Sequence, residues 1–194
     1  MGRPVRRTHP DDPHPALIFT PTTLTGLWLI DLERRPDPRG YFARSFCTKE
    51  FADHGIVAPF VQCNLSYNTN RGTLRGMHWQ AEPYPEGKLV RCTRGAIFDV
   101  AVDIRDDSPT RHQWVGVELS AENGRALYIP GGFAHGFQTL CDDTEVFYQM
   151  TETYHGDLAR GARWDDPAFG IDWPVASPIL SDRDLCHPLV APPT

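Results

Sequence analysis

The stretch LRGMHWQAEPYPEGKLVR, residues 74–91, consists of two short apolar segments joined by a loop that contains proline and glycine. This pattern predicts two β-strands, because strands run for only a few residues and Pro and Gly interrupt them. The same stretch places cationic or titratable side chains in or beside segments that are apolar enough to be half buried: Arg75, His78, Lys88 and Arg91. A β-protein that turns such groups inward requires a polar cavity to hold them.

Short strand candidates separated by turn-forming residues continue on both sides of this stretch. They recur at the spacing of roughly 8–12 residues that is typical of β-sandwiches and barrels. We therefore predict a mainly β fold, an antiparallel double-sheet jelly-roll barrel with an irregular C-terminal segment beyond Tyr154. TKEFADHG, residues 48–55, predicts a short helix with Thr48 at its N-cap. The expected strands are two within 16–33, then 57–66, 72–80, 88–93, 96–105, 112–120, 125–130, 133–140 and 144–152.

Length, charge and cysteine content narrow the class of protein. The chain has 194 residues, so we expect a flexible Pro-rich tail at 1–16 and a single domain at 17–194. A formal net charge of −6 argues against nucleic acid or an anionic membrane as the main partner. The five scattered cysteines, together with the lack of a long apolar run, predict a soluble cytoplasmic protein with reduced thiols.

The segment AIFDVAVDIR, residues 96–105, alternates between two faces of a strand. Its even-numbered residues from 98 to 104 are apolar, whereas the opposite face carries Asp99 and Asp103 among apolar residues. Two carboxylates on one face usually mark a solvated surface. Because this strand is too apolar to lie at a sheet edge, we favour the interpretation that its carboxylates face a polar cavity.

Five titratable residues recur in the expected strands: His78, Lys88, Asp99, His135 and Tyr148. Each alone has a more common structural explanation, such as a paired core histidine or a lysine whose stem lies on the surface. Their coincidence in one small barrel favours a site, because a barrel cavity collects groups from several strands. A histidine base, a tyrosine acid and a lysine beside an oxyanion are suited to moving a proton next to a carbonyl.

Arg75 and His78 are three residues apart, so a regular strand would direct them to opposite faces. Gly76 lies between them and could host a β-bulge that aims both side chains inward.

A metal centre is the main rival explanation for the two strand histidines. PGGFAHG, residues 130–136, resembles the second sequence motif of the cupin superfamily. The first cupin motif has two histidines two residues apart and a downstream glutamate, but here His78 is followed by Trp79 and Gln80. Because Zn and Fe sites normally take three or more protein ligands, we expect a cupin barrel that needs no metal.

Several segments together resemble the dTDP-4-dehydrorhamnose 3,5-epimerase family, over about Thr20 to Pro188. Their occurrence in the order of the family makes the match far more specific than any one segment. They are DPRGYF (37–42), VQCNLS (61–66), LRGMHWQ (74–80), KLVR (88–91), FDVAVDIR (98–105), LYIPGGFAHGF (127–137), WDDPAFGIDWP (164–174) and LSDRD (180–184).

The resemblance implies an isomerase that works without a cofactor on a nucleotide-linked 4-keto-6-deoxyhexose, most simply dTDP-4-dehydro-6-deoxyglucose. His78 would be the general base, Asp184 its orienting partner, Tyr148 the acid on the opposite face of the sugar and Lys88 the group beside the enolate oxygen. Asp99 is expected from the alternation of its own strand, and not from the resemblance, to support the region around His78. The residues implied to contact the nucleotide or the sugar are Arg39, Arg44, Gln62, Asn64, Arg75, His135, Tyr154 and Arg183.

Two positions depart from the family pattern. Arg44 stands where the family usually carries a nucleotide-binding glutamate, and the acidic residue expected soon after Tyr154 has only Asp157 as a candidate. These departures leave open which base the nucleotide carries. The residues also leave open whether C3 alone or both C3 and C5 are inverted, because one base and one acid serve both reactions. The family further implies a homodimer that exchanges N-terminal strands, for which residues 26–33 are apolar enough.

Three other functions remain alternatives at this point. A 3,4-ketoisomerase of the same barrel family would use a similar base, but a donor across the ring at Tyr148 favours inversion. A non-catalytic sugar-nucleotide binding module is disfavoured by the simultaneous presence of base, acid, oxyanion donor and orienting carboxylate. A metal-dependent cupin oxygenase would require the ligands that the first motif lacks.

Overall fold

A computed structural model describes residues 15–57 and 59–190. Most of the predicted N-terminal tail therefore lies outside the described residues, and the last two residues of that tail, Pro15 and Ala16, are buried.

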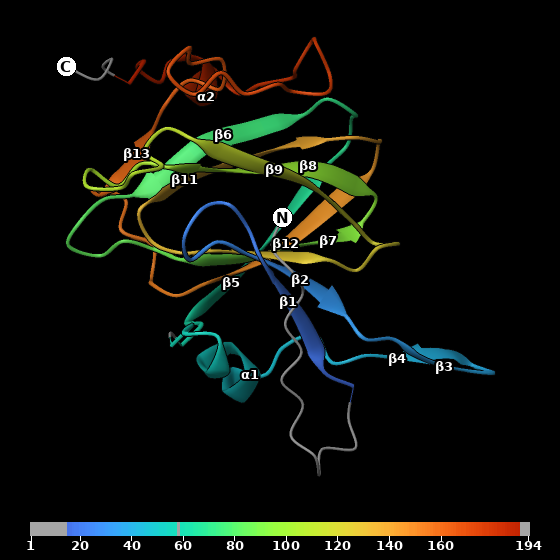
Figure 1. The fold of residues 1–194 in the computed structure, drawn as a ribbon. Coiled ribbons are helices and arrows are strands. Elements are labelled where there is room, and N and C mark those ends of the chain that lie inside the picture. The colour runs from blue at the N-terminus through green and yellow to red at the C-terminus, as the bar shows by residue number, and fades with distance from the viewer. Residues whose placement is uncertain (1–14, 58, 191–194) are drawn as a thin grey trace.

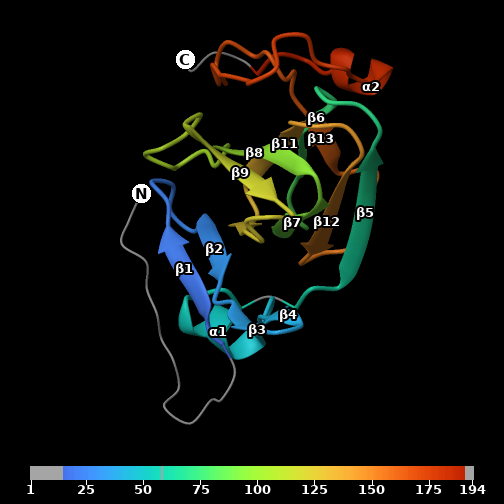
Figure 2. The same ribbon diagram turned by 90° about the vertical axis from the view of Figure 1, so that its right-hand side faces the viewer.

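The described chain forms two antiparallel sheets that face each other, together with a separate two-stranded hairpin (Figures 1 and 2). This is the double-sheet jelly roll expected from the spacing of the strands. The first sheet has the order β1 (Leu17–Pro21), β2 (Trp28–Leu32), β10 (Ala126–Ile129), β7 (Lys88–Arg94), β12 (Thr144–Met150), β5 (Gln62–Asn68). The second has the order β13 (Ala159–Gly161), β6 (Leu74–Gln80), β11 (Phe133–Thr139), β8 (Ala96–Asp103), β9 (Trp114–Ser120).

Apolar side chains pack in three layers. The central layer fills the space between the sheets and includes Leu29, Ile97, Leu119 and Leu127. A second layer lies between the first sheet and α1 (Thr48–Asp53), below the sheets in Figure 1. The third layer joins the outer face of the second sheet to the C-terminal segment, which covers that sheet as expected (Figure 1).

Strand β8 confirms the alternation read from the sequence. Ile97 and Ala101 pack in the central layer, whereas Val100 and Val102 pack in the outer layer under the C-terminal segment. The strand lies between β11 and β9, so it is not at an edge. Both faces are therefore buried, which explains why its sequence is so apolar.

Helix α1 is present, but Thr48, the expected N-cap, is its first helical residue; the N-cap is Cys47, and no side chain caps the helix. Gly55 follows the C-cap with φ of +77°, a left-handed conformation that suits glycine. Three elements were not expected from the sequence: the hairpin of β3 (Arg35–Asp37) and β4 (Gly40–Phe42), strand β13, and the short helix α2 (Asp182–Leu185).

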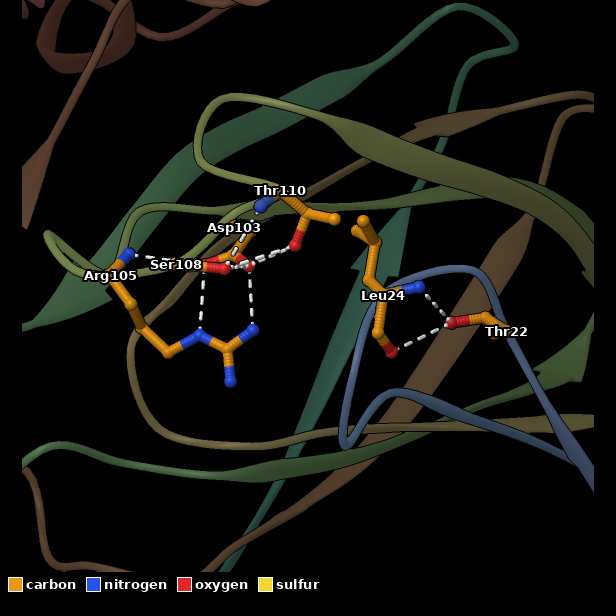
Figure 3. A network of polar contacts seen from close by, with 6 residues as sticks. All are labelled: Thr22, Leu24, Asp103, Arg105, Ser108 and Thr110. Atoms are coloured by element: carbon orange, nitrogen blue, oxygen red, sulfur yellow. Dashed lines mark hydrogen bonds and ion pairs between the residues drawn. The ribbon is translucent and has the colours of Figure 1, made fainter.

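The expectation that both carboxylates of β8 face a polar cavity is wrong for Asp103. Its side chain accepts hydrogen bonds from the guanidinium of Arg105 (2.6 and 2.9 Å) and from the hydroxyls of Ser108 (2.6 Å) and Thr110 (2.7 Å), as Figure 3 shows. These donors come from the loop after β8, which folds back over the end of the strand. The carboxylate thus organises this loop.

Within 15–57 and 59–190, no helix has both the length and the apolar character needed to cross a membrane.

Candidate active site

A cavity of about 660 Å³ opens between the two sheets at the side where β5 and β12 face β13 and β6. This volume is within the range of small-molecule sites. Most of the residues expected to form a site line it: Gln62, Asn64, Arg75, His78, Lys88, His135, Tyr148, Tyr154, Arg183 and Asp184. Sequence positions more than 100 residues apart therefore converge on one cavity.

A β-bulge on β6 brings Arg75 and His78 to the same cavity, as the sequence predicted. His135 of β11 pairs with His78 of β6, and Phe137 of β11 pairs with Arg75 of β6. Two residue steps along β11 are therefore opposed by three along β6, which is the extra residue of a bulge. Gly76 makes this possible, because its φ is +129° and a Cβ there would lie 2.5 Å from the Cα of Gly136. Arg91, by contrast, donates to the backbone oxygen of Ser45 (3.2 Å) and is not among the residues that line the cavity.

His78 and Asp184 form a hydrogen-bonded pair at the cavity wall. His78 Nε2 lies 2.6 Å from Asp184 Oδ1. Asp184 Oδ2 accepts a hydrogen bond from the Ser181 hydroxyl (3.0 Å), and that hydroxyl also accepts one from the Asp184 N–H as the N-cap of α2. The carboxylate is thereby fixed, while the His78 side chain is 38% exposed. With Nε2 engaged, Nδ1 is the nitrogen of His78 left to accept a proton.

The pKa of Asp184 lies below its usual range. Burial alone would raise this pKa, but the hydrogen bond and charge of His78 and the Ser181 hydroxyl outweigh burial. Asp184 is therefore an anion that holds the His78 ring and stabilises its protonated form.

His135 is held by a second carboxylate. Its Nε2 lies 2.8 Å from Asp99 Oδ1, and both side chains are buried. Asp99 does not itself line the cavity, so it acts on the site through His135. The two histidines paired across β6 and β11 thus each have their own acidic partner.

Lys88 and Tyr148 enter from the first sheet. Lys88 forms an ion pair with Glu86, in which both side chains are buried. Burial raises the pKa of Tyr148, the nearby charge of Glu86 raises it further, and Arg75 partly opposes this effect. Tyr148 is therefore a neutral phenol at physiological pH and can donate a proton.

Two charged residues of the cavity were missed by the sequence analysis. Glu86 lies in the proline- and glycine-containing loop before β7, where a charged residue is normally solvated. Arg160 lies on β13, which is too short to be recognised from periodicity. The alternation in KLVR could have indicated that Glu86, two residues before Lys88, shares its side of the chain.

The polar residues on β5 form a separate wall of the cavity. Gln62 donates to the side-chain oxygen of Asn64 (3.3 Å) and accepts from the backbone N–H of Tyr154 (3.2 Å). The ring of Tyr154 is largely exposed beside them. This wall offers amide groups and an aromatic face, as a nucleotide base requires.

Two residues expected to contact substrate lie outside this cavity in the single chain. Arg39 is at the turn of the β3–β4 hairpin, where its side chain pairs with Asp37 (2.8 Å). Arg44 forms a largely buried ion pair with Glu50, whose other oxygen accepts from the Leu17 N–H (2.7 Å). Neither residue is among those that line the cavity.

The arrangement can carry out proton transfer on both sides of a bound molecule. His78 comes from β6 of one sheet and Tyr148 from β12 of the facing sheet. A base and an acid on opposite walls suit removal of a proton from one face of a carbon and its return to the other. Lys88 supplies a positive charge from the same sheet as Tyr148, and the arginines of the cavity suit a phosphate-bearing ligand.

Comparisons with known proteins identify the family of this chain. The family model described as dTDP-4-dehydrorhamnose 3,5-epimerase matches residues 21–191. The chain is 47% identical over 173 residues to a dTDP-4-dehydrorhamnose 3,5-epimerase of Sinorhizobium fredii, with 89% of each chain covered. It is 53% identical over 150 residues to that of Shigella flexneri, with 77% of this chain and 82% of the relative covered.

Solved structures of the family share the fold. The crystal structure of the Bacillus anthracis dTDP-4-dehydrorhamnose 3,5-epimerase, with TDP and PPi bound, matches with a TM-score of 0.88 and 44% identity over 90% of this chain and 100% of that chain. The Legionella pneumophila enzyme in complex with dTDP-4-keto-L-rhamnose matches with a TM-score of 0.84 and 41% identity, over 89% and 92%. The chain described here belongs to the dTDP-4-dehydrorhamnose 3,5-epimerase family.

Proposed function

We propose that this protein is an epimerase that inverts C3, C5 or both in a nucleotide-linked 4-keto-6-deoxyhexose, most simply dTDP-4-dehydro-6-deoxyglucose. The observation that carries the proposal is the convergence of the His78–Asp184 pair and Tyr148 from facing sheets on one cavity. The nucleotide ligands of the solved relatives, TDP and dTDP-4-keto-L-rhamnose, support the class of substrate.

The proposed reaction begins with proton removal by His78. The 4-keto group acidifies the protons on C3 and C5, because the resulting carbanion is delocalised onto the carbonyl oxygen as an enolate. His78 Nδ1 takes the proton, and the anionic Asp184 at Nε2 stabilises the imidazolium that forms. Lys88 stabilises the enolate oxygen, and a donor of this kind typically contributes on the order of 100- to 1,000-fold to the rate.

Tyr148 completes the inversion by donating its phenolic proton to the opposite face of the same carbon. Its raised pKa keeps it protonated until the enolate forms. No cofactor is needed for these steps, because the keto group of the substrate accepts the electron pair and later returns it. The same base and acid could serve C3 and C5 in turn after the ring rotates.

Glu86 adds a step that the family resemblance did not imply. In the single chain it neutralises Lys88, so the ammonium must turn from Glu86 toward the enolate oxygen as charge develops there. Since Glu86 also raises the pKa of Tyr148, its carboxylate tunes both groups that handle the negative charge of the intermediate.

We further propose that the protein is a homodimer located in the cytoplasm. The β3–β4 hairpin projects away from the sheets (Figure 1) and exposes Tyr41 and Phe42, so a second copy could cover it. Such a partner would also explain why Arg39 does not line the cavity of its own chain. A monomeric mass at micromolar concentration, measured by light scattering, would contradict the dimer.

The test of the proposed function is incubation with dTDP-4-keto-6-deoxyglucose in D₂O while NMR follows the protons on C3 and C5. Deuterium at both carbons would support a 3,5-epimerase, and deuterium at C3 alone would indicate a single-centre epimerase. Exchange at neither carbon would contradict the proposed substrate, and the same measurement would then be made with a GDP-linked 4-keto sugar.

A further inference from the structure

His187 is a largely buried histidine that the proposed reaction does not use. It follows α2, and its side chain is only 13% exposed. The ring is seated against Gly161 of β13 so closely that a Cβ at position 161 would lie 2.4 Å from ring atoms. Its Nε2 is buried and has no hydrogen-bond partner among the described residues. Buried polar atoms normally have a hydrogen-bond partner, so this nitrogen is a candidate ligand atom for a bound group.

The unpartnered nitrogen points toward the proposed catalytic pair. His187 Nε2 lies 3.7 Å from Asp184 Oδ1, the same oxygen that lies 2.6 Å from His78 Nε2. One ligand atom from each of these three residues lies within 4.8 Å of the others. Two imidazole nitrogens and a carboxylate oxygen form a common donor set for Zn²⁺.

The distances fit a tetrahedral ion after a small movement. Zn²⁺ bonds of about 2.0–2.1 Å place neighbouring ligand atoms roughly 3.4 Å apart. The separation of His187 from Asp184, 3.7 Å, is already close to this value, whereas His78 and Asp184 would have to separate by about 0.8 Å. The ligand atoms of the two histidines lie within 4.8 Å of each other and would have to reach the same spacing. His78 lines the open cavity and is partly exposed, so an ion has a path of entry.

The charge states also suit a cation. Histidine binds Zn²⁺ through a ring nitrogen that carries no proton, and Nε2 of His187 is buried with no hydrogen-bond partner among the described residues. Asp184 is anionic, so the proton between it and His78 belongs to the imidazole. A Zn²⁺ ion bound at Nε2 of His78 takes the place of that proton, which moves to Nδ1 as the ring changes tautomer, so the imidazole stays neutral.

We propose that His187, Asp184 and His78 form a binding site for a transition-metal cation, and that Zn²⁺ bound there reversibly inhibits the protein. With the ion on Nε2 of His78, Nδ1 carries the ring proton and has no lone pair left to accept another from the substrate, and Asp184 is no longer available to stabilise an imidazolium. The inhibition rests on the proposed function of His78, whereas the binding does not.

The binding experiment uses the full-length protein, stripped of metal, with ZnCl₂ titrated against a chromophoric chelator. We expect one Zn²⁺ per chain at micromolar or tighter affinity. His187→Asn and His187→Gln should each weaken binding by at least the roughly 10- to 100-fold that loss of a supporting group costs a metal site. His112→Asn, a histidine outside the cluster whose positive φ also suits asparagine, should bind as the wild type does. Cys186→Ser should do so as well, which separates the cluster from the neighbouring exposed thiol.

Two measurements distinguish a failure of the metal site from a failure of the proposed function. In ¹⁵N spectra, Zn²⁺ should shift the imidazole signals of His78 and His187 together, and this needs no substrate. In turnover, the ratio of activity with Zn²⁺ to activity with EDTA should be low for the wild type and close to one for both His187 variants. The proposal would be overturned if the wild type did not bind Zn²⁺, or if the His187 variants bound it as well as the wild type does. It would also be overturned if only Cys186→Ser lost binding, or if Zn²⁺ bound to an active enzyme without inhibiting it.

Discussion

Asp103 and Asp184 are both buried carboxylates with a lowered pKa, yet their partners differ in kind. Asp103 binds a guanidinium and two hydroxyls, all from the loop that follows its own strand (Figure 3). Asp184 binds an imidazole from a strand more than 100 residues away. The partners of Asp103 keep their protons at any physiological pH, whereas His78 can gain and lose one.

Asp103 and Asp184 together show which feature sets the proposed catalytic carboxylate apart. A shifted pKa does not, because the pKa of Asp103 is lowered by structural hydrogen bonds alone. The distinguishing feature is a titratable partner that borders the cavity while the carboxylate stays fixed. Asp99 is intermediate, since its partner His135 lines the cavity but is itself buried.

Replacing His78 tests the proposed role of the His78–Asp184 pair, and we expect it to have the largest effect on turnover. His78→Ala removes the proposed base, which should lower turnover by roughly 100- to 10,000-fold, the typical contribution of general base catalysis. Substrate binding should change little, because the arginines that suit the diphosphate remain. Single-turnover rates and calorimetric titration with dTDP would measure the two quantities, and turnover close to that of the wild type would rule out His78 as the base.

Tyr148→Phe distinguishes the proposed role of Tyr148 on one wall of the cavity from that of His78 on the other. The variant keeps the ring but loses the proton donor, so inversion should slow on the order of 100-fold. Exchange of the substrate proton with D₂O should slow much less, because His78 can still remove and return it on its own face. NMR follows both rates in one sample. Equal slowing of exchange and inversion would mean that Tyr148 does not reprotonate the enolate.

Asp103→Asn tests whether Asp103 stabilises the fold without taking part in turnover. An amide cannot accept from every donor around it, and an unmet buried hydrogen bond costs on the order of 2 kcal/mol of unfolding free energy. The folded variant should retain its turnover, because Asp103 does not line the cavity. Urea denaturation and initial rates measure these quantities. Asp106→Asn is the matched control, since that carboxylate is 84% exposed and its loss should change stability little.

Local pattern was sufficient to predict much of this structure. The strand segments, the alternation of β8 and the bulge at Gly76 all follow from residue type and spacing, because short-range sterics control them. The residues that gather in the cavity were identified through segments that resemble one family, and the structure brings most of them together.

The remaining features depend on contacts that no local pattern encodes. Asp99 and Asp103 share one face of β8, but which neighbour covers each is decided by a loop and by a distant strand. Glu86 lies in a loop whose composition predicts exposure, although it is buried against Lys88. His187 lies three residues after Asp184, so local spacing brings these two together, but its contact with Gly161 of β13 depends on how the C-terminal segment packs on the second sheet.

The smallest expected effect is on the pH dependence of stability. Burial would raise the pKa of Asp103, but hydrogen bonds from Arg105, Ser108 and Thr110 together hold it well below its ordinary value of 3.8. Because the pKa is lower in the folded state, the carboxylate stabilises the fold above pH 4 and this contribution is lost as the pH falls below that value.

Asp103→Asn should therefore have an unfolding free energy that falls less steeply with acid than that of the wild type. The two curves should approach each other below pH 4, and urea titrations over a pH series would measure the gap. Asp184→Asn should flatten the curve in the same direction, because the pKa of Asp184 is also lowered. Only Asp184→Asn should at the same time lower turnover at neutral pH, since only Asp184 acts through a group that exchanges protons with the substrate. If Asp103→Asn kept the full acid dependence of the wild type, the network in Figure 3 would not be what holds that carboxylate ionised.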